Sequence, residues 1–169
     1  QELRLGGCGI SPSGLDVLLR ARACLETPPV LGGAAHCLTI VGEGAAALHA
    51  LNLAGMQRDR GDTSIRGLVL VTPTLHPYGI PDARMLGNLP ETYILPTAKG
   101  PDSDATTALA NAIDEAGTVV TMRPQLTNEP LRIAWALADH DIYETVLEVA
   151  RLVRKIAADC AEDQPSETF

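Results

Sequence analysis

The sequence predicts an α/β protein with a mostly parallel β-sheet that carries helices on both faces. Short, continuous apolar runs alternate along the chain with segments of helical periodicity. Continuous apolar strands are typical of sheets buried on both faces, and helices of roughly 12 to 18 residues are the usual crossovers between parallel strands. The length of 169 residues, with 46% hydrophobic and 20% charged residues, fits one globular domain.

The first predicted elements lead to a glycine-rich turn. Residues 1–12 predict a loop, after which Ser13 can cap a helix over about 14–26, where leucines recur at helical spacing. Two prolines and two glycines predict a loop over 27–35. The apolar run 37–41 predicts a buried strand that ends at a glycine pair, and the helix that follows covers 45–60.

The later elements continue the same alternation of strands and helices. They are a strand at 67–72 ended by Pro73, a loop at 74–89, a strand at 92–95, a helix at 104–117, a strand at 118–122, and helices at 129–138 and 142–159. Gly117 is typical of a helix-terminating position. We expect residues 1–159 to form the domain and the acidic residues 160–169 to form a flexible tail.

The charge balance excludes several classes of partner. The chain has 13 basic and 21 acidic residues, for a net charge of −8, and such a surface repels the phosphates of nucleic acids. Aromatic residues make up only 3%, which argues against stacking on bases. No apolar run reaches the roughly 18 residues of a membrane span. The start QELRLGG predicts no signal peptide, and because it lacks Met we expect a processed chain or a piece of a longer one.

The four cysteines show no spacing typical of a disulfide framework or a metal site. Cys8, Cys24, Cys37 and Cys160 are therefore expected to be reduced, in the reducing environment of the cytoplasm. No cluster of His, Cys and Asp has the spacing of metal ligands, so we expect neither a metal nor a cofactor.

The segment LTIVGEGAAALHA, from Leu38, places two glycines at a sharp strand-to-helix turn. One interpretation is a dinucleotide fingerprint G-x-G-x-x-A formed by Gly42, Gly44 and Ala47. This interpretation needs an acidic residue after the next strand, and the sequence there, VTPTLHP, has none. The other interpretation is a nucleophile elbow, the G-x-S-x-G turn that exposes a catalytic serine in α/β-hydrolases.

Several blocks around this turn resemble the hormone-sensitive-lipase-like carboxylesterases of the α/β-hydrolase fold. They are LGGAAHCLTIVGEGAAALHA from Leu31, RDRG from Arg58, GLVLVTP from Gly67, and LPETYILPTAKGPDSDATTALANAIDEAGTVV from Leu89. The resemblance covers roughly residues 4–158. It implies a shortened α/β-hydrolase core that lacks the first strands. Most of the lid is also missing, because only about 15 residues join Pro73 to Leu89.

The departures from the family pattern fall on the catalytic positions. The former elbow is Gly42, Glu43, Gly44 and Ala45, and the resemblance places the nucleophilic serine at Gly44. The family's acid falls on Gly100, and its histidine falls in the segment Asn128, Glu129 and Pro130. Ester hydrolysis needs a nucleophile, a base and an orienting carboxylate, so the resemblance implies that the triad is lost.

Other residues are candidates for rebuilding a site. Glu43 lies beside the elbow, His76 follows the strand at 67–72, and Asp102 and Asp104 follow the strand at 92–95. Each also has a simpler structural explanation: Asp104, for example, matches a family residue that caps the next helix. The remaining histidines, His36, His49 and His140, are not expected to be catalytic.

Two functions of different classes follow. The first is a non-catalytic homologue, or pseudoenzyme, that acts as an accessory or binding subunit in a homo- or hetero-oligomer, with a full-length hydrolase as one candidate partner and a small apolar molecule as a possible ligand. Family dimers often use the last strand and helix; here that helix carries Ile142, Val146, Val149, Leu152, Val153 and Ile156. The alternative is an enzyme with altered, non-triad chemistry of hydrolase, cyclase or acyl-transfer type. A third possibility is one piece of a cleaved or fused polypeptide whose missing strands come from another chain.

Overall fold

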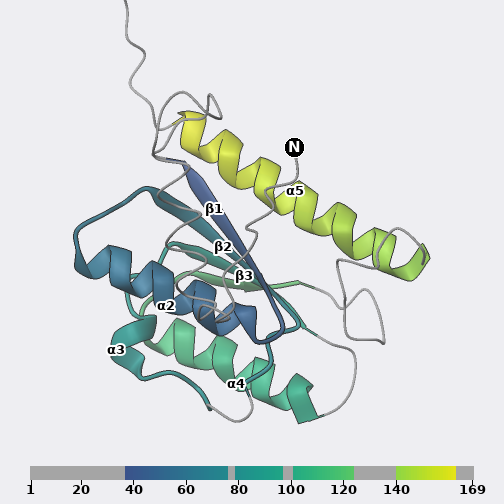
Figure 1. Ribbon diagram of the computed structural model, residues 1–169, viewed down its shortest axis with the longest axis horizontal. Coiled ribbons are helices and arrows are strands. Elements are labelled where there is room, and N and C mark those ends of the chain that lie inside the picture. Colours follow the sequence, from purple (N-terminus) through teal and green to yellow (C-terminus); the bar gives the residue numbers. More distant parts are fainter. Residues whose placement is uncertain (1–36, 76–78, 97–100, 124–139, 163–169) are drawn as a thin grey trace, which may run out of the picture.

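The computed structural model describes residues 37–75, 79–96, 101–123 and 140–162, and in these the chain forms a four-stranded parallel sheet (Figure 1). Its elements are β1 (Leu38–Glu43), α2 (Ala46–Asp59), β2 (Ile65–Val71), α3 (Ala83–Leu86), β3 (Glu91–Leu95), α4 (Pro101–Glu115), β4 (Val120–Met122) and α5 (His140–Glu162). The strand order is β1-β2-β3-β4, so each strand lies beside the one before it in the chain. All four carboxyl ends therefore meet at one edge of the sheet.

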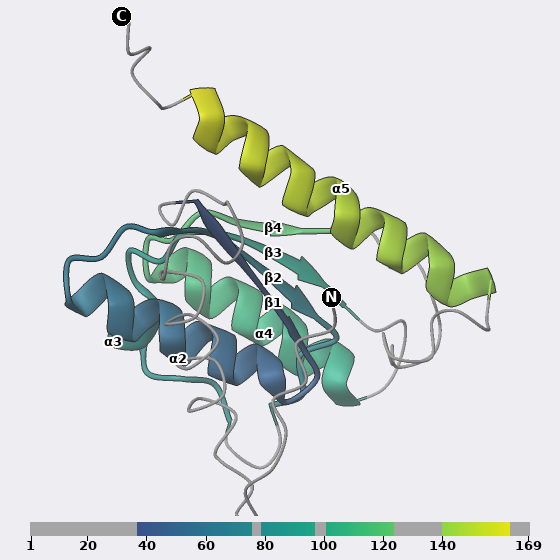
Figure 2. The ribbon, with the colours of Figure 1, turned by 45° about the horizontal axis from the view of Figure 1, so that its top comes forward.

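The helices form two layers, one on each face of the sheet. Of the helices that the structure describes, α2, α3 and α4 lie on one face and α5 lies on the other, as the two views together show (Figure 2). Strand β2 serves both layers, because alternate side chains of a strand point to opposite faces. Leu68 and Leu70 pack into the core beneath α2 and α4, whereas Val69 and Val71 pack against Leu152 and Ile156 of α5. The predicted α/β class with helices on both faces is confirmed.

Helix α5 approaches β2 closely at a glycine. A β-carbon added at Gly67 would lie 2.5 Å from Cδ1 of Ile156, which is closer than real atoms pack. The clear strand predicted at 67–72 thus carries a glycine because the opposing helix fills the space above it. The absence of a side chain at position 67 thus allows α5 to pack close to the sheet.

Substituting Gly67 by alanine is expected to lower the free energy of unfolding by about 1–3 kcal/mol, the usual cost of overpacking a core. Ile156→Val removes the Cδ1 atom that the new methyl group would meet. In the Ile156→Val background the cost of Gly67→Ala should therefore be clearly smaller, by about 0.5 kcal/mol or more. Urea denaturation of the four proteins measures this coupling, and equal costs in both backgrounds would contradict the packing argument.

Polar contacts add to the attachment of α5. Arg123, just after β4, pairs with Glu148 at 3.0 Å, and Lys155 pairs with Glu91 of β3 at 3.6 Å. The Lys155 ammonium also lies 5.7 Å from the centre of the Tyr93 ring. The hydrogen bond to Asp159 raises the pKa of Lys155, and burial raises the pKa of Tyr93. Because Lys155 is half exposed, its pairs orient α5 rather than supply much stability.

The expectation of reduced, unpaired cysteines is wrong for two of the four. Cys37, just before β1, forms a disulfide with Cys160 near the end of α5, with the two Cα atoms 6.2 Å apart. The two residues are 123 positions apart in the chain, so no spacing pattern could reveal the pair. Helix α5 also continues to Glu162 and so includes the first three residues of the predicted tail, of which Cys160 is buried. Cys8 and Cys24 lie outside the described residues.

Two local predictions around α3 and α4 need correction. The segment predicted as loop contains the short helix α3, which Asp82 caps by accepting a hydrogen bond from the Arg84 amide at 2.9 Å. Helix α4 begins at Pro101, so Asp104 lies in its first turn and is not its cap. Proline favours the first helical position, because the amide it lacks would be unbonded there. The terminating role of Gly117 is confirmed by its φ of +83°.

The predicted helices at 14–26 and 129–138, and the loop at 27–35, lie outside the described residues. Among the helices that the structure does describe, none is long and apolar enough to span a bilayer.

Candidate functional site

The turn from β1 into α2 has the backbone geometry of an elbow at the carboxyl edge of the sheet. Gly44, at its apex, has a φ of +58°, in the left-handed region that side chains disfavour. A β-carbon on Gly42 would lie 2.7 Å from the Ala47 Cα and 2.8 Å from the Ala46 carbonyl oxygen. The helix therefore turns back so tightly over the end of β1 that position 42 must be glycine.

Backbone hydrogen bonds tie the apex to the end of β2. The Gly44 amide donates to the Val71 carbonyl at 2.9 Å, and the Thr74 amide donates to the Gly44 carbonyl at 3.1 Å. A β-carbon at position 44 would meet only the Thr74 hydroxyl, at 3.8 Å. The apex is thus a fixed point with room for a side chain, and the residue that occupies it has none.

Within the described residues, the candidate catalytic side chains do not come together around this apex. Glu43 is half-buried at the end of β1 and has an interaction partner. Asp104 is exposed on α4, and for Asp102 only the backbone of α4 is described. His76, Gly100 and the segment Asn128, Glu129 and Pro130 lie outside the described residues. Within the described part of the chain, no three acidic, histidine or cysteine side chains are placed to hold a metal ion.

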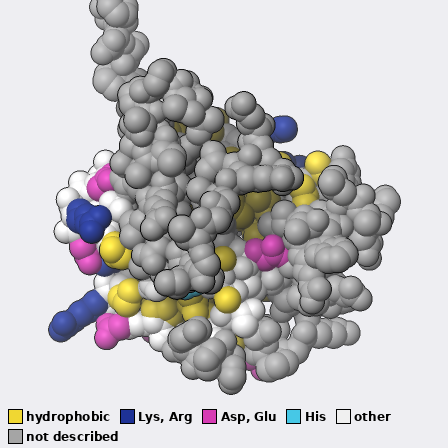
Figure 3. Space-filling model, in the orientation of Figure 1, with side chains coloured by type: hydrophobic (Ala, Val, Ile, Leu, Met, Phe, Trp, Pro, Cys, Tyr) yellow, Lys and Arg dark blue, Asp and Glu magenta, His cyan; other side chains and the backbone are white. Residues whose placement is uncertain are grey.

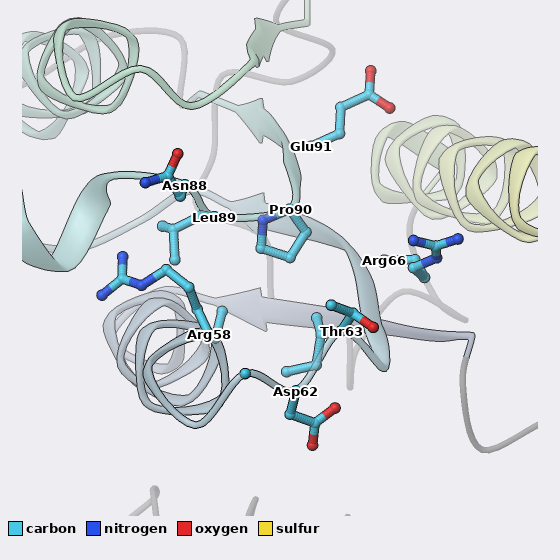
Figure 4. Close-up of a pocket in the computed structure, with 11 residues that line it drawn as sticks. Arg58, Asp62, Thr63, Arg66, Asn88, Leu89, Pro90 and Glu91 are labelled. Carbon is cyan, nitrogen blue, oxygen red and sulfur yellow. The ribbon is translucent and has the colours of Figure 1, made fainter.

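One cavity, of about 370 Å³, opens at the amino edge of the sheet, the end opposite to the elbow. Figure 4 shows Arg58 and Arg66 on its two sides, with Leu89 and Pro90 between them. Arg58 donates to the carbonyls of Gly87 and Met85, the latter at 3.3 Å, and pairs with Asp59 at 2.7 Å. The Arg58 guanidinium thus holds the approach to β3 in place. Ligands of open parallel sheets bind at the carboxyl edge, so this cavity is a weaker candidate for a site.

A second cavity, of about 380 Å³, begins at the elbow and follows α2. Its lining residues are Ala45, Leu48, His49, Asn52, Gly79, Pro81 and Met85. The sequence interpretation assigned no role to His49 and missed this cavity. A signal was present, because positions 45, 48, 49 and 52 follow the spacing of one helix face. The opposite wall, at residues 79–85, could not be paired with that face from the sequence.

Comparison with solved structures decides the fold. The chain superposes on brefeldin A esterase, described as a bacterial homologue of human hormone-sensitive lipase, with a TM-score of 0.70, 16% identity, and coverage of 95% of this chain and 57% of the esterase. It superposes on an esterase from Rhizomucor miehei with a TM-score of 0.69, 15% identity, and coverage of 88% and 61%. It superposes on an esterase of Pyrobaculum calidifontis with a TM-score of 0.68, 16% identity, and coverage of 85% of this chain and 59% of the esterase. The chain has the α/β-hydrolase fold.

The form of the fold is the one found in hormone-sensitive-lipase-like esterases, as the resemblance predicted. The chain spans about 60% of the length of these esterases, consistent with the shortened core. No family model matches the sequence, and no curated relative matches it. At identities of 14–16% the structural likeness establishes the fold and leaves the activity to the residues at the site.

Proposed function

We propose that this chain is a non-catalytic α/β-hydrolase homologue that works as an accessory or binding subunit. The observation that carries the proposal is Gly44 at the apex of the elbow. The backbone there keeps the sharp, strained turn on which α/β-hydrolases present a serine, with a φ of +58°. Glycine supplies no hydroxyl, so the elbow can position a bound group but cannot attack it.

The other triad positions support the same proposal. By resemblance to the esterases, the acid position is Gly100 and the histidine position falls at Asn128, Glu129 or Pro130. None of these side chains can serve as the imidazole base that takes the proton of the nucleophile. We expect all three functional groups to be lost together in a protein that no longer catalyses ester hydrolysis.

The described sheet also offers a place for a partner, which an accessory role requires. The chain spans 57–61% of the length of the esterases it resembles. In the described sheet β1 pairs only with β2, which leaves its other edge as the place where further strands would add. Helix α5 contributes less than expected, because Leu152 and Ile156 pack on their own sheet, and only half-buried residues such as Val146 and Val153 remain for a partner.

Assays of the purified chain with 4-nitrophenyl acetate and butyrate test the proposal. We expect no turnover above buffer at protein concentrations that give a full signal for an active esterase. Turnover that scales with protein and disappears in Glu43→Gln would instead establish the altered chemistry considered as the alternative. Native mass measurement on the same sample is expected to find the chain in an oligomer; a stable monomer without turnover would contradict the accessory role.

Gly44→Ser tests whether the missing hydroxyl alone explains the lack of activity. The new β-carbon fits, 3.8 Å from the Thr74 hydroxyl, but the positive φ should cost about 1–2 kcal/mol of stability. We expect a folded variant that still fails to turn over 4-nitrophenyl butyrate, because by resemblance the position of the base holds Asn128, Glu129 or Pro130 and no histidine. Ala46→Ser, two residues further along and exposed, is the matched control. Multiple turnovers by Gly44→Ser alone would show that a base is still in place.

A further inference from the structure

The cavity beside the elbow, which we call the α2 cavity, has the properties of a ligand site. It encloses about 380 Å³, within the range of small-molecule pockets. Ala45, which directly follows the elbow apex, stands at one end, and the cavity extends along α2 to Asn52. Its Ala45 end therefore lies near the carboxyl edge of the sheet, where ligands of this class of fold bind.

The two walls of the α2 cavity are held by different means. On the helix side, Leu48 is only 7% exposed and belongs to the main core, so this wall is rigid. On the opposite side, Gly79, Pro81 and Met85 come from the segment that leads into α3 and from α3 itself. A site with one wall fixed by the core keeps its shape before a ligand arrives, which lowers the cost of binding.

Apolar side chains remain exposed around the cavity. Met85, which lines it, is 38% exposed, and Ile80, between the lining residues Gly79 and Pro81, is 43% exposed. On the face shown in Figure 3, hydrophobic side chains gather over α2 and α3. Exposed apolar side chains clustered at the mouth of a hollow favour contact with an apolar ligand over contact with water.

The polar groups of the cavity limit the charge of that ligand. Among the described residues that line the cavity, His49 and Asn52 have hydrogen-bonding side chains, and none is a lysine, arginine, aspartate or glutamate. A charged group buried there would lose its hydration without meeting an opposite charge. An amide or carbonyl group, by contrast, can exchange hydrogen bonds with an imidazole and a carboxamide.

We propose that the α2 cavity binds a small neutral molecule with an apolar body and one amide- or carbonyl-type group, which His49 and Asn52 recognise. The apolar body lies against Leu48, Pro81 and Met85. This binding needs no catalytic group, so it holds whether or not the chain hydrolyses esters. Binding and turnover are measured separately, so a negative result for the binding proposal would not contradict the proposed function, and the reverse also holds.

Three probes of nearly identical shape test the proposal: neutral benzamide, cationic benzamidine and anionic benzoate. Each is titrated into the ¹⁵N-labelled full chain while the amide resonances are followed by NMR. We expect benzamide to bind with a Kd in the millimolar range and to shift Ala45, Leu48, His49, Asn52 and Met85 saturably. Benzamidine and benzoate should bind at least roughly tenfold more weakly. Equal binding of a charged probe, or saturable shifts centred elsewhere, would overturn the proposal.

Two neighbouring alanines provide a matched pair of variants. Ala45 lines the cavity and Ala46 does not, and both are exposed, so neither substitution disturbs the core. Ala45→Phe fills the cavity and should weaken benzamide binding at least about tenfold, whereas Ala46→Phe should stay within about twofold of the parent chain. Asn52→Ala should weaken binding severalfold without moving the probe. Parent-like affinity in a folded Ala45→Phe variant, or no saturation by the parent chain up to about 10 mM, would refute the site.

Discussion

Replacing Cys160 by serine is expected to lower the free energy of unfolding by about 2–5 kcal/mol, a large part of the total for a domain of this size. The bond to Cys37 joins residues 123 positions apart, so its loss frees a long loop in the unfolded chain. It also joins the start of β1 to the last turns of α5. Since α5 is the single helix described on its face of the sheet, its detachment would expose Val69 and Val71.

Chemical denaturation with and without reductant measures this effect. Cys37→Ser should cost about as much as Cys160→Ser, and the double variant about as much as either one, because a single bond is lost in all three. Added reductant should destabilise the parent chain and leave the variants unchanged. If reductant has no effect on the parent chain, the two thiols are not bonded in solution. Structural disulfides persist in oxidising compartments, so an intact bond in native material would also overturn the expected cytoplasmic location.

Sequence patterns could predict some features of this fold, and the disulfide is one of the features that they could not predict. The run at 67–72 predicted a strand clearly, because β2 is buried on both faces and its apolar residues are therefore continuous. Helix α3 was missed because four residues are too few to show a helical period, and only Asp82 marks its start. The pairing of Cys37 with Cys160 depends on where α5 packs, and that is determined by contacts such as the one between Gly67 and Ile156.

The elbow and the α2 cavity also differ in how well the sequence could predict them. The elbow is local: a strand, two glycines and a helix lie within a few residues, so the sequence predicted a sharp strand-to-helix turn at Gly42 and Gly44. The resemblance to the esterases then identified that turn as an elbow. The α2 cavity is not local, because one wall is a helix face and the other is a segment some 30 residues further along the chain. His49 was considered as an isolated helix residue, and the role proposed for it depends on Pro81 and Met85, which line the same cavity.

Gly42→Ala is expected to be the most damaging of the glycine-to-alanine substitutions in the described residues. The added methyl group would meet backbone atoms, the Ala47 Cα at 2.7 Å and the Ala46 carbonyl oxygen at 2.8 Å, and neither can move as a side-chain tip can. The start of α2 would have to shift away from β1, which disturbs the buried Ala47 and Leu51. We expect a loss of about 3 kcal/mol or more, or failure to fold.

Gly55→Ala, in the same helix, is the control for this prediction. The nearest atom to its added β-carbon is the Met85 carbonyl oxygen at 3.4 Å, an ordinary contact, and alanine is the better helix former by about 1 kcal/mol. This variant should be neutral or slightly stabilised in urea denaturation, while Gly42→Ala unfolds much earlier. Equal stability of the two variants would mean that α2 is not held against β1 at the elbow. The rigid support would then be missing both for Gly44, at the proposed former nucleophile position, and for the helix wall of the α2 cavity.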